Sequence, residues 1–257
     1  MNNKEKSRYA RQISLSKIGE AGQQKLLDSS ILIIGMGGLG SPAAIYLAAA
    51  GVGSLIVSDF DQIEESNLQR QIIHKTKDIG ELKAFSAKQT ISEINPDCAV
   101  EAIDWQLDED ELELYAQKVD LILDCTDNFP TRFMINRVSV KTATPLVSGA
   151  VIRMEGQIAS YLPSPDTPCY QCLYKEEFEN TETCAVEGVL SPVVGVIGTM
   201  QALQAILVLI GETESINGKL LLFDGLNMEW QSVNLPKNPN CPICGISTAI
   251  TTNNLTV

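Results

Sequence analysis

The chain has 257 residues and a formal net charge of −13 at pH 7, with 19 Lys and Arg against 32 Asp and Glu. This length suffices for one large domain with a full hydrophobic core. The acidic balance argues against a nucleic-acid partner, because binding the phosphate backbone requires clustered Lys and Arg. No apolar run occurs in the charged segment 1–11, so we expect no secretory signal and a cytoplasmic location in which the 7 Cys stay reduced.

The N-terminal half alternates predicted helices and strands. Residues 8–27 show an amphipathic pattern typical of a helix. The apolar segment 31–35 predicts a buried strand, and a helix over 41–50 and a strand over 54–59 complete a right-handed βαβ unit. The alternation continues, with helices expected over 82–94, 109–117 and 129–141 and strands over 98–103, 119–124 and 145–148. We therefore predict an α/β fold, a Rossmann-like doubly wound and mainly parallel sheet, with its ligand site beyond the carboxyl ends of the strands.

The order of elements changes after Gly149. Strands expected over 157–161 and 219–224 extend the sheet in antiparallel orientation around a buried helix over 193–210. A long loop with three prolines, residues 163–188, lies between these elements. Loops of this length usually carry function or are disordered.

An uncharged segment, residues 189–210, is long enough to span a bilayer. Pro192, Gly195, Gln201 and Gln204 interrupt it, and no cluster of Lys or Arg flanks it. A helix that is apolar on all sides also fits the interior of a large α/β protein. We therefore expect a core helix and no membrane partner.

Two Cys-x-x-Cys pairs, Cys169/Cys172 and Cys241/Cys244, stand far apart in the chain. Four thiolates in this paired spacing suit tetrahedral zinc and tie distant segments together. A four-cysteine site leaves no open position for a substrate, so we expect a structural zinc and chemistry elsewhere. Two disulfides, or unrelated core thiols, are the alternative.

A glycine-rich segment follows the first predicted strand and precedes a helix. Gly35, Gly37 and Gly40 have the G-x-G-x-x-G spacing, with Gly38 between them. Glycines let a phosphate approach the backbone, and the helix N-terminus offers unpaired N–H donors. Asp59, which ends the second strand, can accept hydrogen bonds from ribose hydroxyls. These residues indicate NAD, FAD or ATP, and a dinucleotide dehydrogenase is the competing interpretation.

Charged residues after the second strand favour ATP. Arg70 and Lys83 can neutralise a polyphosphate, and Asp127, at the end of another strand, can hold Mg²⁺. The single His, His74, makes no general case for acid–base catalysis. Taken singly, each of these charges could belong to a surface ion pair. Together they predict nucleotidyl transfer, which depends mainly on positioning and charge neutralisation.

These motifs, in this order, resemble the ThiF/MoeB/HesA adenylyltransferases, which are relatives of the ubiquitin-activating enzymes. The resemblance covers about residues 7–245 and rests on Arg8-Tyr-Ala-Arg11-Gln12, the glycine loop, Asp59-Phe-Asp61, Ser66-Asn-Leu-Gln-Arg-Gln71, Asp124-Cys-Thr-Asp-Asn128 and the two Cys pairs. It implies that the chain uses MgATP to adenylylate the C-terminal glycine of a ubiquitin-like sulfur-carrier protein ending in Gly-Gly. Pyrophosphate is released, and the acyl-adenylate then accepts sulfur.

The resemblance also implies roles for the matched residues. Arg11 would reach into the active site of a neighbouring subunit, so a homodimer with two composite sites is implied. The implied catalytic residues are Arg11, Arg70, Lys83 and Asp127, with Asp127 as the Mg²⁺ ligand. The implied nucleotide contacts are Gly35, Gly37, Gly38, Gly40, Asp59, Asp61, Ser66, Asn67, Leu68, Gln69, Arg70, Gln71, Lys83, Asp127 and Asn128. The implied zinc ligands are Cys169, Cys172, Cys241 and Cys244.

Cys184 is a further thiol of interest, in the polar segment 181–185. Its position resembles that of a cysteine that, in the thiamine branch of the family, can join the carrier through sulfur. We hypothesise that it touches the carrier's tail during sulfur transfer. An exposed thiol without a required role is the alternative, since reactivity depends on a local pKa.

One ThiF-type domain is expected over residues 1–257. Its expected parts are an N-terminal helical arm (7–27), a nucleotide-binding Rossmann-like part (28–152), a C-terminal part with the zinc site and a carrier-binding surface (153–245) and a frayed tail (246–257). No rhodanese-like domain follows residue 245 in this sequence, so we expect sulfur from a separate donor such as a cysteine desulfurase or a rhodanese.

The pathway stays open at the level of sequence. Residues 147–157 resemble the molybdopterin branch, whereas residues 22–28 and 222–225 look more like the thiamine branch. Two other functions stay open as well. A NAD-dependent oxidoreductase would explain the glycine loop and Asp59 alone, and a non-catalytic scaffold for a ubiquitin-like protein would explain the fold without the catalytic charges.

Overall fold

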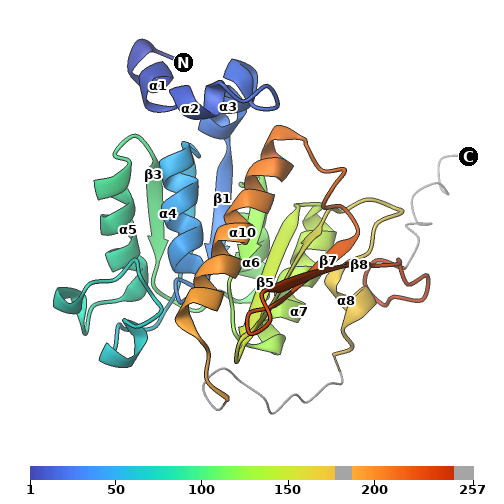
Figure 1. Cartoon of the computed structure of the whole chain (residues 1–257). Coiled ribbons are helices and arrows are strands. Elements are labelled where there is room, and N and C mark those ends of the chain that lie inside the picture. The colour runs from blue at the N-terminus through green and yellow to red at the C-terminus, as the bar shows by residue number, and fades with distance from the viewer. Residues whose placement is uncertain (177–186, 246–257) are drawn as a thin grey trace, which may run out of the picture.

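The computed structural model describes residues 1–176 and 187–245, which build one eight-stranded sheet (Figure 1). The strands are β1 (Ser30–Ile34), β2 (Ser54–Ser58), β3 (Ala99–Ile103), β4 (Leu121–Asp124), β5 (Leu146–Ile152), β6 (Glu155–Tyr161), β7 (Lys219–Asp224) and β8 (Glu229–Asn234). Their order across the sheet is β3-β2-β1-β4-β5-β6-β7-β8. Pairs from β3 to β5 are parallel, and pairs from β5 to β8 are antiparallel. The predicted mainly parallel α/β sheet with antiparallel extension is confirmed.

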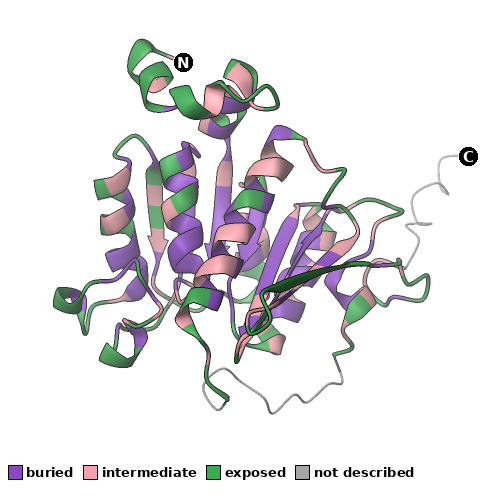
Figure 2. Cartoon of the chain, viewed as in Figure 1, coloured by how far each residue is buried: buried purple, intermediate pink, exposed green. Residues whose placement is uncertain are grey.

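Helices cover both faces of the sheet. The helices are α1 (Asn3–Arg8), α2 (Ala10–Ile13), α3 (Gly19–Asp28), α4 (Gly40–Ala50), α5 (Lys83–Ile94), α6 (Glu109–Ala116), α7 (Phe129–Thr142), α8 (Tyr170–Leu173) and α10 (Ser191–Ile210), with 3₁₀ turns η1 (Glu65–Asn67) and η2 (Thr76–Asp78). Ile31 and Ile33 of β1 pack among residues of α4, α5 and α10, whereas Leu32 and Ile34 face α6 and α7. Successive side chains of a strand point to opposite faces, so a wholly apolar strand fills two cores. Figure 2 shows the buried residues concentrated in the sheet and on the helix sides that face it.

The N-terminal arm is not the single helix expected over 8–27. It forms α1, α2 and α3, with a turn between α2 and α3. The Ser14 hydroxyl donates back to the Ala10 carbonyl oxygen, and Gly19 has φ of 57°, a left-handed conformation that favours glycine. α1 begins at Asn3, before the expected range, and of the three helices only α3 has buried residues.

Besides the 3₁₀ turns, the helix α8 and the strand β8 were not predicted. α8 is a single turn inside the loop expected over 163–188, and every residue of the edge strand β8 is exposed, so β8 lacks the apolar alternation that marks a strand. α10 is the expected core helix, with Pro192 and Leu203 as its exposed residues and the others buried or intermediate. Within the described residues, α10 alone is long and apolar enough to cross a membrane by length and composition.

Candidate active site

A cavity of about 1220 Å³ opens at the carboxyl ends of the parallel strands β1, β2 and β4 and continues past β5 to β8. It brings together most of the nucleotide contacts that the sequence predicted. The predicted residues that line it are Gly35, Gly37, Gly38, Asp59, Asp61, Arg70, Gln71, Lys83, Asp127 and Asn128. The predicted nucleotide contacts that do not line it are Gly40, Ser66, Asn67, Leu68 and Gln69.

The glycine loop turns sharply from β1 into α4 at the wall of this cavity. Gly35 has φ of 93°, and a Cβ atom there would lie 2.7 Å from the Cys125 carbonyl oxygen. A Cβ atom at Gly40 would lie 2.0 Å from the Gly35 carbonyl oxygen. Larger residues are therefore excluded from both positions. The tight turn places the N-terminus of α4, which is the positive end of the helix dipole, at the cavity.

Asp59 holds the glycine loop from the end of β2. Its carboxylate accepts hydrogen bonds from the Met36 N–H at 2.7 Å and the Asp61 N–H at 3.0 Å. Burial raises the pKa of Asp59, and the positive charge of Lys83 acts in the opposite direction. Because the loop bond leaves Asp59 on the cavity wall, the acid is in place to accept a ribose hydroxyl as well.

Lys83 is a buried cation at the cavity wall. Its side chain is only 7% exposed, and its Nζ lies 2.7 Å from an Asp61 carboxylate oxygen whose own side chain is 56% exposed. The backbone N–H of Lys83 donates to the Asp61 carbonyl oxygen at 2.9 Å, so α5 begins with Lys83 facing β2. A phosphate could replace the exposed Asp61 carboxylate as the partner of this ammonium group.

Arg70 reaches the cavity from the turn that follows η1. The Asn67 side chain accepts the Glu64 N–H at 3.1 Å and so caps this turn, while Arg70 donates to the Ser66 carbonyl oxygen at 3.2 Å. Asn67 is 9% exposed and serves the turn instead of the cavity wall. The predicted nucleotide contacts of Ser66, Asn67, Leu68 and Gln69 therefore stay predictions, and in this structure the segment positions Arg70.

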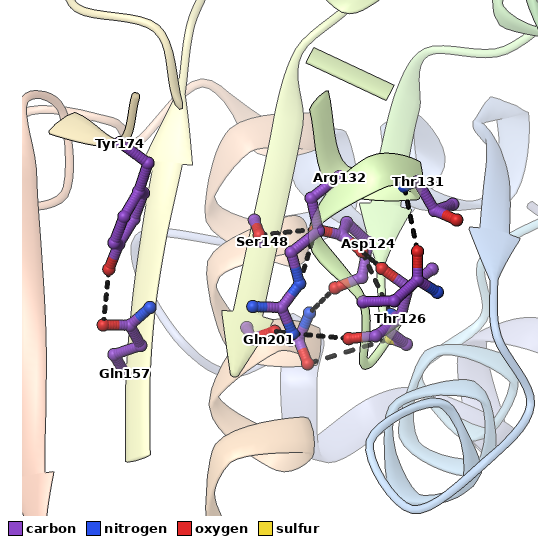
Figure 3. A network of polar contacts seen from close by, with 11 residues as sticks. Asp124, Thr126, Thr131, Arg132, Ser148, Gln157, Tyr174 and Gln201 are labelled. Carbon is purple, nitrogen blue, oxygen red and sulfur yellow. Dashed lines mark hydrogen bonds and ion pairs between the residues drawn. The ribbon is translucent and has the colours of Figure 1, made fainter. Parts of the chain in front are cut away.

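A buried polar network fixes the loop that follows β4 (Figure 3). Asp124 is 1% exposed, and its carboxylate accepts the Thr126 hydroxyl at 2.7 Å and the Ser148 hydroxyl at 2.6 Å. Gln201 of α10 donates to the Asp124 carbonyl oxygen at 2.7 Å. Three segments that are distant in the chain thus hold one strand end. Buried hydrogen bonds of this kind restrict the movement of the strand end that they hold.

Arg132 of α7 completes the network and reaches the cavity. Its guanidinium donates to the Thr126 carbonyl oxygen at 2.5 Å and to the Gly149 carbonyl oxygen at 3.3 Å, and it lies 4.0 Å from the Asp124 carboxylate. Burial acts to lower the pKa of Arg132, but Asp124, Tyr170 and Tyr174 together outweigh it, so the pKa of Arg132 is raised. Sequence reasoning missed Arg132, Ser148 and Gln201. For Gln201, the available signal was a polar glutamine within a long segment that has no charged residue.

Asp127 and Asn128 stand on this fixed loop. The Asn128 side chain accepts the Thr131 N–H at 3.0 Å and caps α7, which leaves Asp127 exposed at the cavity. A single carboxylate open to solvent is compatible with Mg²⁺, which usually binds one or two carboxylates together with substrate phosphates. Thr126 is held by the buried network and Asn128 by its cap of α7, so both neighbours of Asp127 are fixed at the cavity wall.

Arg11 lies away from this cavity. It is exposed on α2 and lines a shallow hollow with Arg8, Tyr46 and Ala50 at the C-terminal end of α4. The glycine loop is at the other end of α4, and a helix of 11 residues is about 16 Å long. Figure 1 shows the N-terminal arm at the opposite end of the molecule from the start of α4. Arg11 could therefore serve a nucleotide cavity only in another copy of the chain, and its role stays a prediction.

The four cysteines of the two pairs form one cluster. Their Sγ atoms all lie within 4.8 Å of one another, with 3.6 Å between Cys169 and Cys241 and 3.4 Å between Cys172 and Cys244. Four sulfurs at about 2.3 Å from a tetrahedral zinc would stand about 3.8 Å apart, so the donor set fits zinc. The cysteines are free, so the disulfide alternative is not formed. Cys184 lies outside the described residues.

Comparisons with known proteins agree with this geometry. The profile of the ThiF family matches residues 9–243. The chain is 45% identical over 249 residues to the sulfur carrier protein ThiS adenylyltransferase of Escherichia coli, across 97% of this chain and 99% of that protein. It is 42% identical over 245 residues to the molybdopterin-synthase adenylyltransferase of the same species, across 95% and 98%. A crystal structure of E. coli MccB with ATP has a TM-score of 0.79 at 25% identity, across 95% of this chain and 75% of that chain.

Proposed function

This chain belongs to the ThiF family, and on that basis we propose that it is an ATP-dependent adenylyltransferase. Its proposed substrate is the C-terminal glycine of a ubiquitin-like sulfur-carrier protein, which it activates for sulfur transfer in thiamine or molybdopterin biosynthesis. The observation that carries the proposal is the meeting of a glycine loop, two cations and an exposed carboxylate in one cavity, since Gly37, Arg70, Lys83 and Asp127 all line it.

These residues suit attack of a carboxylate on the α-phosphorus of ATP. The N-terminus of α4 and the cations of Arg70 and Lys83 favour a bound triphosphate, because helix N-termini and basic side chains stabilise anions. The same charges stabilise negative charge that builds on the phosphate oxygens in the transition state. No general base is required, because the attacking group is already a carboxylate at neutral pH. Positioning and charge neutralisation are then the main contributions of the protein.

Two metals belong to the proposal. Asp127 would hold Mg²⁺, which supplies further charge neutralisation at the phosphates. Cys169, Cys172, Cys241 and Cys244 would hold a structural zinc that joins the loop after β6 to the segment after β8. Both donor sets fit the metal assigned to them.

The far arm of the cavity suits an extended peptide. Past the glycine loop, the cavity runs along β5 to β8, where Gly156, Gln157, Leu222 and Gln231 line it. A tail that ends in Gly-Gly has no side chains near its carboxylate, so it can lie in a narrow channel and reach the α-phosphate. We assign this arm to the tail of the carrier.

Further parts of the proposal concern partners and place. We propose a homodimer, because Arg11 cannot reach the cavity of its own chain. A separate cysteine desulfurase or rhodanese would supply the sulfur, and the enzyme would act in the cytoplasm. Relatives at 45% and 42% identity serve different carriers by name, so the carrier is left to experiment.

The non-catalytic scaffold and the NAD-dependent oxidoreductase explain fewer of these observations. A scaffold has no need for Arg70, Lys83 and Asp127 on one cavity wall. An oxidoreductase uses the glycine loop and Asp59, but it has no role for an exposed carboxylate held opposite them. Competition between ATP and NAD for the purified protein separates the two nucleotides directly.

ATP–pyrophosphate exchange with Mg²⁺ tests the proposal. The enzyme is given a thiamine-type and a molybdopterin-type carrier in separate reactions, each with an intact Gly-Gly tail and each without its last glycine. We expect exchange with at least one intact carrier and none with either shortened one. Exchange that ignores the last glycine, or none with either intact carrier, contradicts the proposal. The carrier with the faster exchange identifies the pathway.

A further inference from the structure

His74 is the single histidine of the chain, and it is buried behind the glycine loop. It is 6% exposed and lies between two partners. Its Nε2 is 3.0 Å from the Met36 carbonyl oxygen, and its Nδ1 is 3.0 Å from the Ser86 hydroxyl of α5. None of the roles assigned above uses this residue, although it contacts the loop that faces the nucleotide.

These two partners determine the tautomer of the ring. A carbonyl oxygen can only accept, so the contact with Met36 is a hydrogen bond only if Nε2 carries the hydrogen. In the neutral ring, Nδ1 then accepts from the Ser86 hydroxyl at 3.0 Å, which is nearer to that hydroxyl than its other acceptor, an Asp78 carboxylate oxygen at 3.4 Å. Burial, and next the positive charge of Lys83, lower the pKa of His74, whereas the Met36 bond and Asp78 act to raise it. The neutral form with hydrogen on Nε2 is therefore favoured at neutral pH.

The bond from His74 fixes the orientation of one peptide group. In a planar trans peptide, the C=O and the N–H point in opposite directions. The Met36 carbonyl points at the buried His74, so the Gly37 N–H of the same peptide is directed away from the ring, and Gly37 lines the cavity. Within the described residues this N–H has no hydrogen-bond acceptor. It is thus a free donor at the place where an anion is expected.

The preceding peptide, between Gly35 and Met36, is held by Asp59. The Met36 N–H donates to Asp59, while the Met36 carbonyl accepts from His74. Ser86, the second partner of His74, is on the first turns of α5, the helix that begins with Lys83. His74 therefore joins the glycine loop, which Asp59 also holds, to the helix that carries Lys83.

We propose that His74 is a positioning residue, which as the Nε2–H tautomer turns the Met36–Gly37 peptide so that the Gly37 N–H faces the phosphates of the nucleotide. The inference rests on the proposed function, since it assumes that a phosphate-bearing nucleotide occupies the cavity. It distinguishes His74 from an ordinary core residue, because its loss should weaken the binding of phosphates and leave the binding of the nucleoside unchanged.

A pair of substitutions separates the two ring nitrogens. In His74→Gln the amide nitrogen can occupy the place of Nε2 and still donate to Met36, whereas in His74→Asn the shorter amide reaches only the place of Nδ1. Binding of ATP and of adenosine is measured by calorimetry for both variants and the wild type. We expect His74→Asn to weaken ATP binding about fivefold to tenfold, the usual contribution of one hydrogen bond, and His74→Gln to restore it to within about threefold. Adenosine affinity should change less than about twofold in both.

The wild-type protein supplies a second test that needs no variant. In a tag-free protein labelled with ¹⁵N, two-bond proton–nitrogen correlations of the one histidine report its tautomer. We expect the hydrogen on Nε2 at neutral pH, with and without ATP. A ring with its hydrogen on Nδ1 overturns the inference, because it cannot donate to Met36.

The remaining outcomes are also decisive. If His74→Asn binds ATP as tightly as the wild type, or loses adenosine affinity to the same extent as ATP affinity, His74 has no particular role in positioning the loop. If the wild type binds adenosine and not ATP, the proposed function itself is wrong, and the phosphate-directing role of His74 fails with it. Tight ATP binding by the wild type together with equal variants overturns the inference alone.

Discussion

The parallel and antiparallel halves of the sheet present different kinds of side chain to one cavity. At the ends of β1, β2 and β4, two charged side chains are buried, Lys83 at 7% and Asp124 at 1% exposure, and Asp124 accepts hydrogen bonds from Thr126 and Ser148. Along β8, by contrast, every residue is exposed, although Glu229 and Gln231 line the same cavity. The difference agrees with the roles proposed above, which are nucleotide binding in the parallel half and carrier binding in the antiparallel half.

The largest effect is expected from breaking the buried network of the parallel half. Arg132→Met removes the cation that faces Asp124 and serves the carbonyl oxygens of Thr126 and Gly149. Removing one partner of a buried ion pair usually costs about 3 to 5 kcal/mol. We expect the free energy of unfolding in urea to fall by that amount.

Arg137 on the same helix supplies the matched control. It pairs with Glu109 and Glu176 at the surface, so Arg137→Met should cost less than about 1 kcal/mol. Equal losses in the two variants would mean that the network at the end of β4 has no special stability.

The next largest effect concerns activity alone. Asp127→Ala should lower ATP–pyrophosphate exchange about 100-fold to 1000-fold, the range seen when one group that stabilises the transition state is removed. The melting temperature should stay unchanged, because Asp127 is exposed and has no hydrogen bond in the described structure. Asp166→Ala, which removes an exposed carboxylate from the antiparallel half, is the control and should exchange at the wild-type rate. Full exchange in Asp127→Ala would exclude the magnesium assignment.

In the antiparallel half, by contrast, we expect a substitution that lowers stability and leaves ATP affinity unchanged. Cys169→Ser removes one of the four clustered thiols, and bound zinc, measured by atomic absorption, should be lost. We expect a stability loss of about 2 kcal/mol, which lowers the melting temperature by about 5 °C. ATP affinity below that temperature should change less than about twofold, since the cluster does not line the cavity. A large loss of ATP affinity would show that the two halves are not separate in function.

The smallest effect is a pH dependence that arises in the parallel half. Burial lowers the pKa of His74 below 6.5, so the unfolded chain binds a proton at a pH where the native protein does not. The contribution of His74 to stability is present above pH 6.5 and is lost as the pH falls below it. The slope cannot exceed about 1.4 kcal/mol per pH unit for one proton. We therefore expect the free energy of unfolding, measured in urea between pH 7.5 and 5.5, to change less with pH in His74→Gln than in the wild type. Identical slopes would contradict a buried neutral histidine.

Local pattern was sufficient to predict most of the fold. The apolar segment 31–35 predicted β1, and the alternation of strand and helix patterns after it predicted β2 and the parallel sheet. Such elements can be predicted locally because each has its own hydrophobic period. β8 could not be predicted, because an exposed edge strand has no apolar face. The buried position of α10 was predicted, because an uncharged segment of this length suits a core helix.

The residues of the candidate site also divide into those that the sequence predicted and those that it did not. Gly35, Lys83 and Asp127 lie in local motifs, so spacing and resemblance identified them. Arg132 and His74 were missed because their partners are distant in the chain. A single buried polar residue also leaves no periodic pattern in the sequence. Their role depends on which carbonyl oxygens they meet, which only the folded chain determines.

Transfer of label from ATP to the carrier tests adenylylation most directly. The enzyme, Mg²⁺ and an intact carrier are incubated with ATP labelled at either the α- or the γ-phosphorus, and the carrier is isolated at low pH. We expect the α-label on the carrier and the γ-label in pyrophosphate, with neither label on a carrier that lacks its last glycine. A carrier that acquires the γ-label would show phosphorylation in place of adenylylation and would contradict the function proposed for this cavity.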